Sequence, residues 1–466
     1  MSPARRLPAK PAPTEPVAQV IAGLLKTFGG QAGDDLPVRL RAWDGSEAGP
    51  EGTPVLIARS PQALKRILWR PGELGLARAY VSGDLDVEGD LTEALRRFFA
   101  ARPTRRSGLT RRSGLTRRPG TASRPGTARR PSPAALATYA PAALATLRAA
   151  ARLNLLGPLP RPPEPPKCEL RVRGRLHSRA RDQAVIAGHY DVPAAFYQLI
   201  LDPSMAYSCA LWDGRNNLEQ AQKAKLDLIM GKLALEPGQR LLDVGCGWGS
   251  LTLHAAKNRV QVTGVTLSGE QGGFVRQRAR GLGLAADRVD IRIQDYRDPL
   301  GGTYEAAASV EMGEHVGDTQ YPRFCATLYR RLKPGGRLLI QQMSRSGRAR
   351  GGGPFIESYI APDMSMRPVG DTIKLIEQAG FEVIGVQAMR EHYVRTIRAW
   401  AENFERNLPA ISEILTPEQV RVWRLYLAGG ALAFEDGRMG VDQILATKPA
   451  KPTKPAKPTK PAGRAR

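Results

Sequence analysis

The sequence has little cysteine, and its four cysteines, Cys168, Cys209, Cys246 and Cys325, are widely spread with no CxxC pair. Disulfide frameworks and structural zinc sites need closely spaced or patterned cysteines. Neither is therefore expected, and the chain suits a reducing cytoplasm.

Long apolar runs are missing as well. No segment approaches the ~20 consecutive apolar residues that a transmembrane helix needs. The Pro-rich start of the chain, residues 1–25, also lacks the continuous apolar core of a signal peptide. We therefore expect a cytoplasmic protein that is at most peripheral on the inner face of the membrane.

Two stretches contain no acidic residue. Residues 102–130 hold ten arginines and residues 447–466 hold seven lysines and arginines, which together make up most of the formal net charge of +25. Basic arms of this kind suit nucleic acid or an anionic lipid surface. The alternative is that they are solubilising linkers.

Composition divides the chain into segments. We predict a disordered N-terminus (1–17), a small α+β domain (18–100), a basic low-complexity linker with helices (101–180), a main domain (181–445) and a disordered Lys/Pro-rich tail (446–466). The linker repeats the hexapeptide TRRSGL and has no apolar periodicity. The main domain alternates strand-like runs such as RLLDVG and VQVTGVTL with helical stretches. That alternation predicts an α/β fold with a doubly wound, mostly parallel sheet.

A glycine-rich loop follows the first strand of the main domain. In LLDVGCGWGS (241–250), Gly245, Gly247 and Gly249 allow the backbone to pass close beneath a ligand and to turn into the next helix. In an open α/β sheet this loop lies at the carboxyl ends of the strands, where ligands bind. Close packing alone is the alternative reason for such glycines.

Polar residues at the next two strand ends separate the candidate ligands. NAD would need an acid ~20 residues after the loop for its ribose, but VTLSGEQ supplies Thr266, Ser268 and Gln271 there. The third strand ends in IQDYRD, where Asp295 can accept a hydrogen bond from an adenine amino group. These residues favour S-adenosylmethionine over a dinucleotide.

The segment SVEMGEHVG (309–317) gathers Glu311, Glu314 and His315 at the end of an apolar run. Such residues bind metals, transfer protons, stabilise cations or cap helices. No metal site is expected, because this spacing at a strand end does not bring three ligands together. A structural role is expected for His315.

Six segments in this order resemble the cyclopropane fatty acid synthases: HYDVPAAFYQLILDPSMAYSCALW, LLDVGCGWGS, VTLSGEQ, QDYRD, SVEMGEHVG and REHYVRTIRAW. The resemblance covers about residues 181–445 and extends more weakly to LGLARAYVSGDLDVEGDL in the first domain. It implies a class I methyltransferase-like fold. It also implies methyl transfer from S-adenosylmethionine to the cis double bond of unsaturated phospholipid acyl chains. With such a substrate, the charge of the basic arms favours an anionic membrane surface as their partner.

The same resemblance implies the site residues. Those expected to contact the cofactor are Tyr207, Ser208, Asp243, Gly245, Gly247, Thr266, Gln271, Asp295 and Tyr296. Family members hold a bicarbonate ion that takes up a proton, and its ligands map onto the backbone amide of Cys209, Glu314 and Tyr393. Glu314 is thus implied to orient this base and to stabilise the carbocation. Tyr190 is the candidate substrate contact, with an N-cap at Asp191 as the open alternative.

Two features depart from the ring-forming members. Where those have H-x-I, this chain has Gln341 and Met343, and glutamine cannot carry a proton as imidazole does. Glu311 stands where they commonly have glycine and adds a second carboxylate. Both changes resemble the branch that makes tuberculostearic-type lipids. They favour a methylene-branched product, which a separate reductase would have to reduce.

Three other functions remain as alternatives. A cyclopropane-fatty-acyl-phospholipid synthase would share the first chemical step. A nucleic-acid or small-molecule methyltransferase is disfavoured, and no nucleic-acid partner is expected, because the main domain lacks basic residues interleaved with exposed aromatics. A membrane scaffold is disfavoured by the intact glycine loop and Glu314. The sequence leaves the oligomeric state open.

Overall fold

The computed structural model describes residues 15–29, 36–101, 161–189, 192–284, 286–346 and 351–450. Two compact units divide the chain, residues 1–165 and 166–466. The arginine-rich stretch, most of the Lys/Pro-rich tail, and the residues Tyr190 and Asp191 lie outside the described residues. What the sequence predicts for them stays a prediction.

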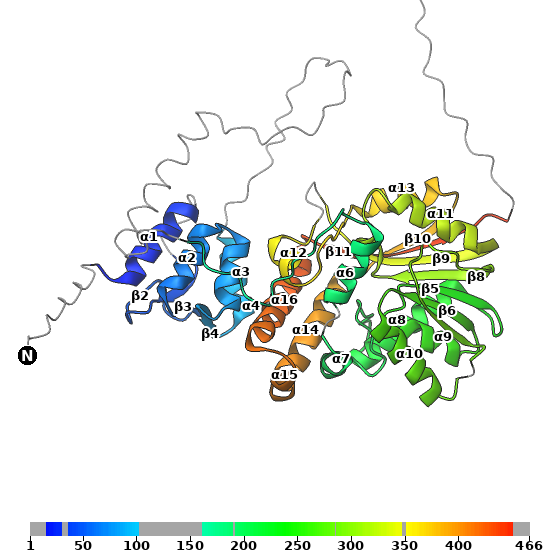
Figure 1. The fold of residues 1–466 in the computed structure, drawn as a ribbon, viewed down its shortest axis with the longest axis horizontal. Helices are drawn as coiled ribbons and strands as arrows, with labels where there is room; N and C mark the ends of the chain where they lie inside the picture. Colours follow the sequence, from blue (N-terminus) through cyan, green and yellow to red (C-terminus); the bar gives the residue numbers. More distant parts are fainter. Residues whose placement is uncertain are drawn as a thin grey trace, which may run out of the picture. The chain divides into compact units, whose positions relative to one another are not determined.

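Within its described residues, the first unit combines helices with four short strands (Figure 1). Its elements are α1 (Val17–Gly29), β1 (Arg39–Arg41), β2 (Glu47–Ala48), β3 (Val55–Ala58), α2 (Pro61–Trp69), α3 (Glu73–Val81), β4 (Leu85–Glu88) and α4 (Leu91–Ala100). The strand order is β2-β1-β3-β4, with β3 parallel to β1 and antiparallel to β4. Ser60 and Asp90 cap α2 and α4 by accepting hydrogen bonds from backbone amides of the first turn.

The second unit is built on a seven-stranded sheet of order β10-β11-β9-β8-β5-β6-β7. Its strands are β5 (Arg240–Val244), β6 (Gln261–Thr266), β7 (Val289–Ile293), β8 (Tyr304–Val310), β9 (Leu332–Ser344), β10 (Glu382–Ala388) and β11 (Gly440–Thr447). Every pairing from β9 to β7 is parallel, and only β11 runs antiparallel to its neighbours. The predicted α/β fold with a mostly parallel sheet is confirmed.

Helices cover both faces of this sheet (Figure 1). They are α6 (Arg179–His189), α7 (Ala194–Ile200), α8 (Leu218–Leu233), α9 (Ser250–Lys257), α10 (Gly269–Gly281), the 3-10 turn η1 (Gly313–His315), α11 (Tyr321–Arg331), α12 (Pro354–Tyr359), α13 (Val369–Gln378), α14 (Arg390–Arg406), α15 (Leu408–Ile414) and α16 (Pro417–Glu435). Strand side chains alternate between the faces. Leu241 and Leu339 pack with α8 and α9, whereas Leu242 and Leu338 pack with α11 and α13.

A separate aromatic core joins α7, α14 and α16. Trp400 and Phe404 of α14 are fully buried with Phe196 of α7, and Trp423 of α16 packs 4.6 Å from the Phe196 ring. Thr416 starts α16 with a capping box to Gln419. These helices therefore form one rigid wall beside the sheet.

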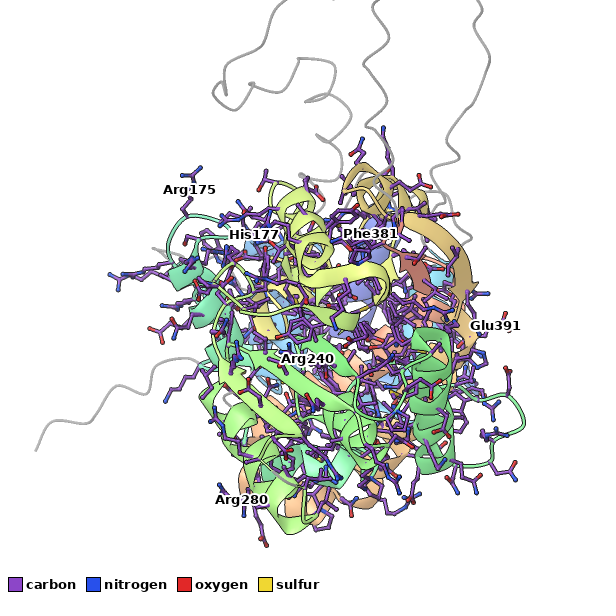
Figure 2. The ribbon with its side chains drawn as sticks, turned by 90° about the vertical axis from the view of Figure 1, so that its right-hand side faces the viewer. Arg175, His177, Arg240, Arg280, Phe381 and Glu391 are labelled. Carbon is purple, nitrogen blue, oxygen red and sulfur yellow. The ribbon has the colours of Figure 1, made fainter. Side chains whose placement is uncertain are left out.

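Charged side chains occupy the outer surface, as at Arg175, Arg280 and Glu391 (Figure 2). Among the described residues, no helix combines the length and the apolar content that crossing a bilayer requires. The same part of the chain contains no group of three or more His, Cys, Asp or Glu side chains placed to hold a metal ion.

Candidate active site

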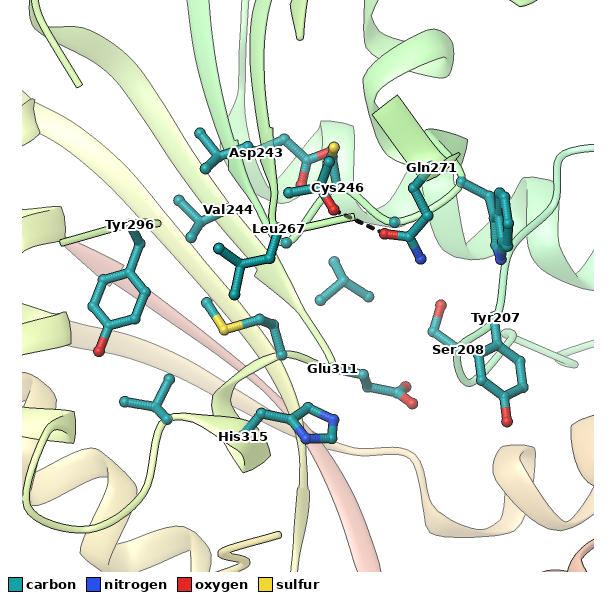
Figure 3. Close-up of a pocket in the computed structure, with 18 of the residues that line it drawn as sticks. Tyr207, Ser208, Asp243, Val244, Cys246, Leu267, Gln271, Tyr296, Glu311 and His315 are labelled. Carbon is teal, nitrogen blue, oxygen red and sulfur yellow. Dashed lines mark hydrogen bonds between the residues drawn. The ribbon is translucent and has the colours of Figure 1, made fainter. Parts of the chain in front are cut away.

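A pocket that is open to solvent at its mouth lies at the carboxyl ends of β5, β6, β7 and β8. One segment after each strand contributes to its wall: residues 243–248, 265–267, 294–297 and 310–312 (Figure 3). β5 has β6 on one side and β8 on the other, so successive crossovers leave it in opposite directions. This is the topological switch point at which open α/β sheets bind ligands.

Glycine is needed for different reasons at the three glycine positions of the loop after β5. Gly245, Gly247 and Gly249 all have positive φ, at 81°, 52° and 83°. A Cβ on Gly245 would lie 2.7 Å from Met312 Cγ, and one on Gly249 would lie 2.7 Å from a methyl carbon of Val275. A Cβ on Gly247 would meet no protein atom within 4 Å. Gly245 and Gly249 thus serve packing, while Gly247 borders open space in the pocket.

Polar groups at the ends of β5 and β6 are held ready for a ligand. Thr252 donates to the Asp243 carboxylate at 2.7 Å, and burial raises the pKa of Asp243 to about 6. Thr266 donates to Oε1 of Gln271 at 2.8 Å. Nε2 of Gln271 is buried without an acceptor among the described residues, and Figure 3 shows it facing the pocket. A ligand oxygen would satisfy this donor.

Asp295, at the end of β7, is engaged with Arg297. The Arg297 backbone amide and Nε donate to Oδ1 of Asp295 at 2.8 and 2.7 Å. Burial raises the pKa of Asp295, but hydrogen bonds from Arg297 outweigh it and hold that pKa below its ordinary value. Arg297 also donates to Asp182 of α6 at 2.8 Å. Asp295 therefore borders the pocket as an ionised carboxylate that orients Arg297.

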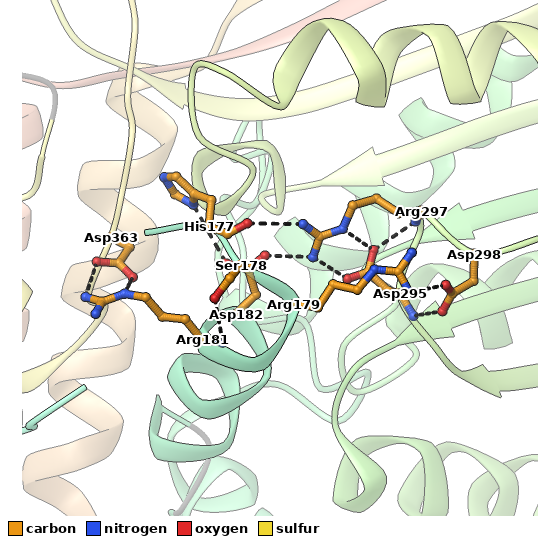
Figure 4. A network of polar contacts seen from close by, with 9 residues as sticks. All are labelled: His177, Ser178, Arg179, Arg181, Asp182, Asp295, Arg297, Asp298 and Asp363. Atoms are coloured by element: carbon orange, nitrogen blue, oxygen red, sulfur yellow. Dashed lines mark hydrogen bonds and ion pairs between the residues drawn. The ribbon is translucent and has the colours of Figure 1, made fainter. Parts of the chain in front are cut away.

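Further ion pairs fasten α6 to the rest of the second unit (Figure 4). Arg181 makes a two-pronged contact to Asp363, at 2.5 and 2.8 Å, and Arg179 donates to Asp298 at 2.5 Å. Bidentate guanidinium–carboxylate pairs fix orientation as well as distance. Because Asp182 and Asp363 both line the pocket, these contacts make α6 part of its rim. The sequence interpretation singled out none of these residues.

A buried lysine supports the segment of the pocket around Tyr207 and Ser208. Lys225 of α8 is 1% exposed and donates to Oγ of Ser208 at 2.9 Å. Burial lowers the pKa of Lys225, while nearby carboxylates, Glu311 first among them, oppose that effect. Tyr207 is joined through its hydroxyl to that of Tyr426 at 3.1 Å. Lys225 was not predicted, although its place on the buried face of α8 could have identified it.

Of the two glutamates in the segment 309–317, Glu311 is the one whose carboxylate lines the pocket, and three donors bind it. The backbone amide of Cys209 and Nε2 of Gln341 donate to Oε1, each at 2.8 Å. The hydroxyl of Tyr393 donates to Oε2 at 2.6 Å. Gln443 of β11 donates to Oε1 of Gln341 at 2.8 Å and so fixes the orientation of that amide. Three separate parts of the fold, the loop before α8, β9 and α14, therefore converge on one carboxylate, and β11 supports them through Gln341.

Burial and these contacts act in opposite directions on Glu311. Desolvation raises the pKa of Glu311 above its ordinary value, and the hydrogen bonds and the charge of Lys225 limit the rise. The backbone of Glu311 is also unusual, with a φ of 53°, while its amide donates to the Gln341 carbonyl at 2.6 Å. A positive φ is uncommon outside glycine and clusters at functional sites.

Glu314, in η1, lies outside the pocket lining. Its Oε1 accepts from the Met343 backbone amide at 2.5 Å, and its Oε2 is buried without a partner among the described residues. Burial, and secondly the charge of Glu311, raise the pKa of Glu314 to about 8. Two neighbouring buried carboxyls cannot both ionise readily. At neutral pH Glu314 therefore keeps its proton, and the three donors around Glu311 favour its charged form.

The structure brings most of the predicted residues together. Those that line the pocket are Tyr207, Ser208, Asp243, Gly245, Gly247, Thr266, Gln271, Asp295, Tyr296 and Glu311. Cys209, Gln341 and Tyr393 meet them through Glu311, and Glu314 does not. His315 also lines the pocket, on the same side as Glu311 (Figure 3).

Glu314→Gln is expected to flatten the pH dependence of stability. The pKa of Glu314 is about 8 in the folded chain against 4.5 ordinarily, so its contribution is complete below pH 4.5 and is lost as the pH rises towards 8. Glutamine has no proton to lose. Between these two pH values the unfolding free energy of the unaltered protein should fall relative to that of the variant, by at most about 1.4 kcal/mol per pH unit, and unfolding temperatures measure the difference. If the stability of both proteins changes with pH in the same way, Glu314 does not have the raised pKa assigned to it.

Comparison with known sequences gives one family. Residues 177–444 match the family of the mycolic acid cyclopropane synthetases. A probable fatty acid methyltransferase of Mycobacterium tuberculosis is 35% identical over 429 residues, 88% of this chain and 91% of the relative. The cyclopropane-fatty-acyl-phospholipid synthase of Escherichia coli is 37% identical over 273 residues, which cover 58% of this chain and 70% of the relative. The tuberculostearic acid methyltransferase of M. tuberculosis is 28% identical over 456 residues, 94% of each.

Solved structures share the fold. The cyclopropane synthase MmaA2 from M. tuberculosis covers 57% of this chain and 98% of its own, with a TM-score of 0.54 and 29% identity. The mycolic acid cyclopropane synthase CmaA1 complexed with SAH and CTAB has a TM-score of 0.53, 29% identity and the same coverage.

Proposed function

Because the chain belongs to the mycolic acid cyclopropane synthetase family, we propose that it methylates the cis double bond of unsaturated phospholipid acyl chains through a carbocation. The class I methyltransferase-like fold and the activity of an S-adenosylmethionine-dependent lipid methyltransferase are confirmed by the family and its solved structures. The finer proposal rests on one observation, the partly buried carboxylate of Glu311 that three donors hold at the wall of the cofactor pocket.

The pocket residues fit S-adenosylmethionine. Gly247 leaves open space beside the loop, and Nε2 of Gln271 is a donor without an acceptor among the described residues. Asp243 and Thr266 add polar atoms suited to ribose hydroxyls, and Tyr207 with Ser208 closes the side nearest Glu311. When bound, the cofactor supplies an electrophilic methyl group on a sulfonium.

Methyl transfer to an alkene requires a particular electrostatic environment. The π electrons of the double bond form the new carbon–carbon bond, and the positive charge moves to the neighbouring carbon of the acyl chain. A preorganised negative group that is not a nucleophile stabilises such a cation. Glu311 has this character, because its oxygens are engaged by Cys209, Gln341 and Tyr393 and cannot swing freely towards the substrate.

We favour the methylene-branched product over the ring. In the methylene route a hydride shifts from the methylated carbon to the cationic carbon, and the new methyl group then loses a proton. In the ring route the methyl group loses its proton directly and closes onto the cation. Gln341, a neutral amide fixed by Gln443, offers no proton acceptor, so proton removal depends on where Glu311 is held. Proton removal is therefore slower than in the ring-forming enzymes, and the hydride shifts before the proton leaves.

An oleoyl phospholipid treated with this enzyme and cofactor is expected to yield an exocyclic methylene. Both products have the same mass, so proton NMR must separate vinylic methylene signals from high-field ring signals. Gln341→His with Met343→Ile should raise the ring fraction, because imidazole adds a proton acceptor beside Glu311. Only ring signals from the unaltered enzyme would refute the methylene assignment and leave the cyclopropane synthase.

Two partners belong to this proposal. A methylene product needs a separate reductase that delivers hydride before a methyl branch results. An anionic membrane surface would hold the basic arms on its inner, cytoplasmic face, each Lys or Arg near it contributing at most ~1 kcal/mol and less at high salt. Lys448 does not belong to that arm, because its Nζ donates to the carbonyls of Tyr329 and Leu332 at 3.0 and 2.7 Å.

A further inference from the structure

The place expected for a bicarbonate ion is already filled. Its implied donors were the Cys209 amide and the Tyr393 hydroxyl, and both donate to the Glu311 carboxylate, at 2.8 and 2.6 Å. The remaining donor, Nε2 of Gln341, binds the same carboxylate. The Met343 amide is taken by Glu314. Bicarbonate therefore does not fit beside these residues, and no step of the reaction is routed through it.

We propose that the carboxylate of Glu311 is the catalytic base that takes the proton from the alkylated acyl chain, so that this enzyme needs no bicarbonate. The inference rests on the proposed function. After the hydride shift a C–H bond of the transferred methyl carbon breaks, its electron pair forms the second bond of the exocyclic C=C and discharges the cation, and the proton ends on Glu311. Release of that proton to solvent restores the carboxylate, and no oxidant or reductant is needed.

The geometry identifies the oxygen that accepts the proton. Among the described residues Oε1 of Glu311 accepts two hydrogen bonds and Oε2 accepts one. A carboxylate oxygen has about two lone-pair positions, so Oε1 is saturated and Oε2 retains one. Oε2 is therefore the proton acceptor, and the Tyr393 hydroxyl orients it.

The neighbouring groups keep Glu311 basic and ionised before the reaction. Glu314, also buried, holds a proton and adds no second charge. The buried ammonium group of Lys225 lies on the α8 side and favours the anion. Desolvation makes Glu311 a stronger base than an exposed glutamate, because burial disfavours its charged form. Proton transfer to it is correspondingly easier once the cation has formed.

The positive φ of Glu311 makes a decisive variant available. Glycine adopts a φ of 53° without strain, so Glu311→Gly removes the carboxylate and leaves its three donors around an empty space. Glu311→Gln removes the base but still fills that space. Added bicarbonate or formate should enter the glycine variant and be excluded from the glutamine variant.

The test measures turnover of the full-length enzyme on oleoyl-phospholipid vesicles in carbonate-free buffer, with and without added bicarbonate. Unaltered enzyme should be equally active in both. Glu311→Gly should lose about 10²-fold or more without an added anion and regain activity saturably with bicarbonate or formate, whereas neither anion should raise the low activity of Glu311→Gln. A bicarbonate requirement of the unaltered enzyme, or failure of both anions to rescue the glycine variant, would overturn the proposal.

A binding measurement separates this inference from the proposed function. NMR line broadening of isotope-labelled bicarbonate needs no lipid substrate and therefore works whatever the protein methylates. Glu311→Gly should bind the ion, and adding Tyr393→Phe to that variant should weaken the binding. The unaltered enzyme should not bind bicarbonate. If it does, and if Tyr393→Phe weakens that binding, Glu311 does not replace the ion, even if lipid methylation is confirmed.

Discussion

Glu311→Gln is expected to lower kcat by about 10²- to 10³-fold, the scale of losing one preorganised charged group in a buried site. Affinity for S-adenosylmethionine should change little, because the nearest polar contacts of Glu311 are to Cys209, Gln341 and Tyr393 and not to the glycine loop. Single-turnover transfer of a labelled methyl group measures the first quantity, and calorimetry with the cofactor measures the second.

Glu314→Gln is the matched comparison for that variant. Glu314 is fully buried, is protonated at neutral pH and lies outside the pocket lining, whereas Glu311 is partly buried and lines the pocket. Replacing a neutral acid by a neutral amide changes little charge, so its loss of turnover should be at least about 10-fold smaller than that of Glu311→Gln. Equal losses would show that the two carboxyls act as one unit and that the division of roles is wrong.

Gly247→Asn is expected to weaken cofactor binding by about 10- to 100-fold, as overpacking typically costs ~1–3 kcal/mol. The φ of Gly247 is 52°, close to the 48° that Ala234 adopts in the same chain. Asparagine tolerates this region better than most residues, so the fold should persist. The new side chain would occupy the open space beside the loop. Calorimetry with S-adenosylhomocysteine, the cofactor after methyl transfer, gives the affinity.

Gly238→Asn provides the control for backbone strain. Gly238 has a φ of 86°, and a Cβ there meets nothing within 4 Å, but it lies in a turn that does not line the pocket. The control should cost some stability and leave cofactor affinity unchanged. If both variants bind the cofactor like the unaltered protein, the loop does not pass beneath it.

The sequence was sufficient for the sheet and for the glycine loop because both depend on local patterns. Apolar runs followed by turns mark β5 to β9, and the side chains at their ends meet because parallel strands end at one edge. The same local patterns could have predicted that Lys225 is buried. It follows Leu218 by seven residues and Ala221 by four, which places it on the buried face of α8.

The roles of Glu311 and Glu314 depend on information that no local pattern holds. A left-handed backbone at Glu311 directs its carboxylate to donors from β9, α14 and the loop before α8. The helix α6 was missed for a related reason. Its sequence has little apolar periodicity, and long-range ion pairs such as that between Arg181 and Asp363 hold it in place.

The position of β11 has a consequence for biosynthesis. This strand is inserted between β9 and β10, and its Gln443 fixes the amide of Gln341 that holds Glu311. A nascent chain that has not yet delivered β11 from the ribosome lacks the hydrogen bond that Gln443 donates to the Gln341 amide. The proposed base is therefore fully positioned only after β11 has joined the sheet, because the strand that completes the sheet also completes the site.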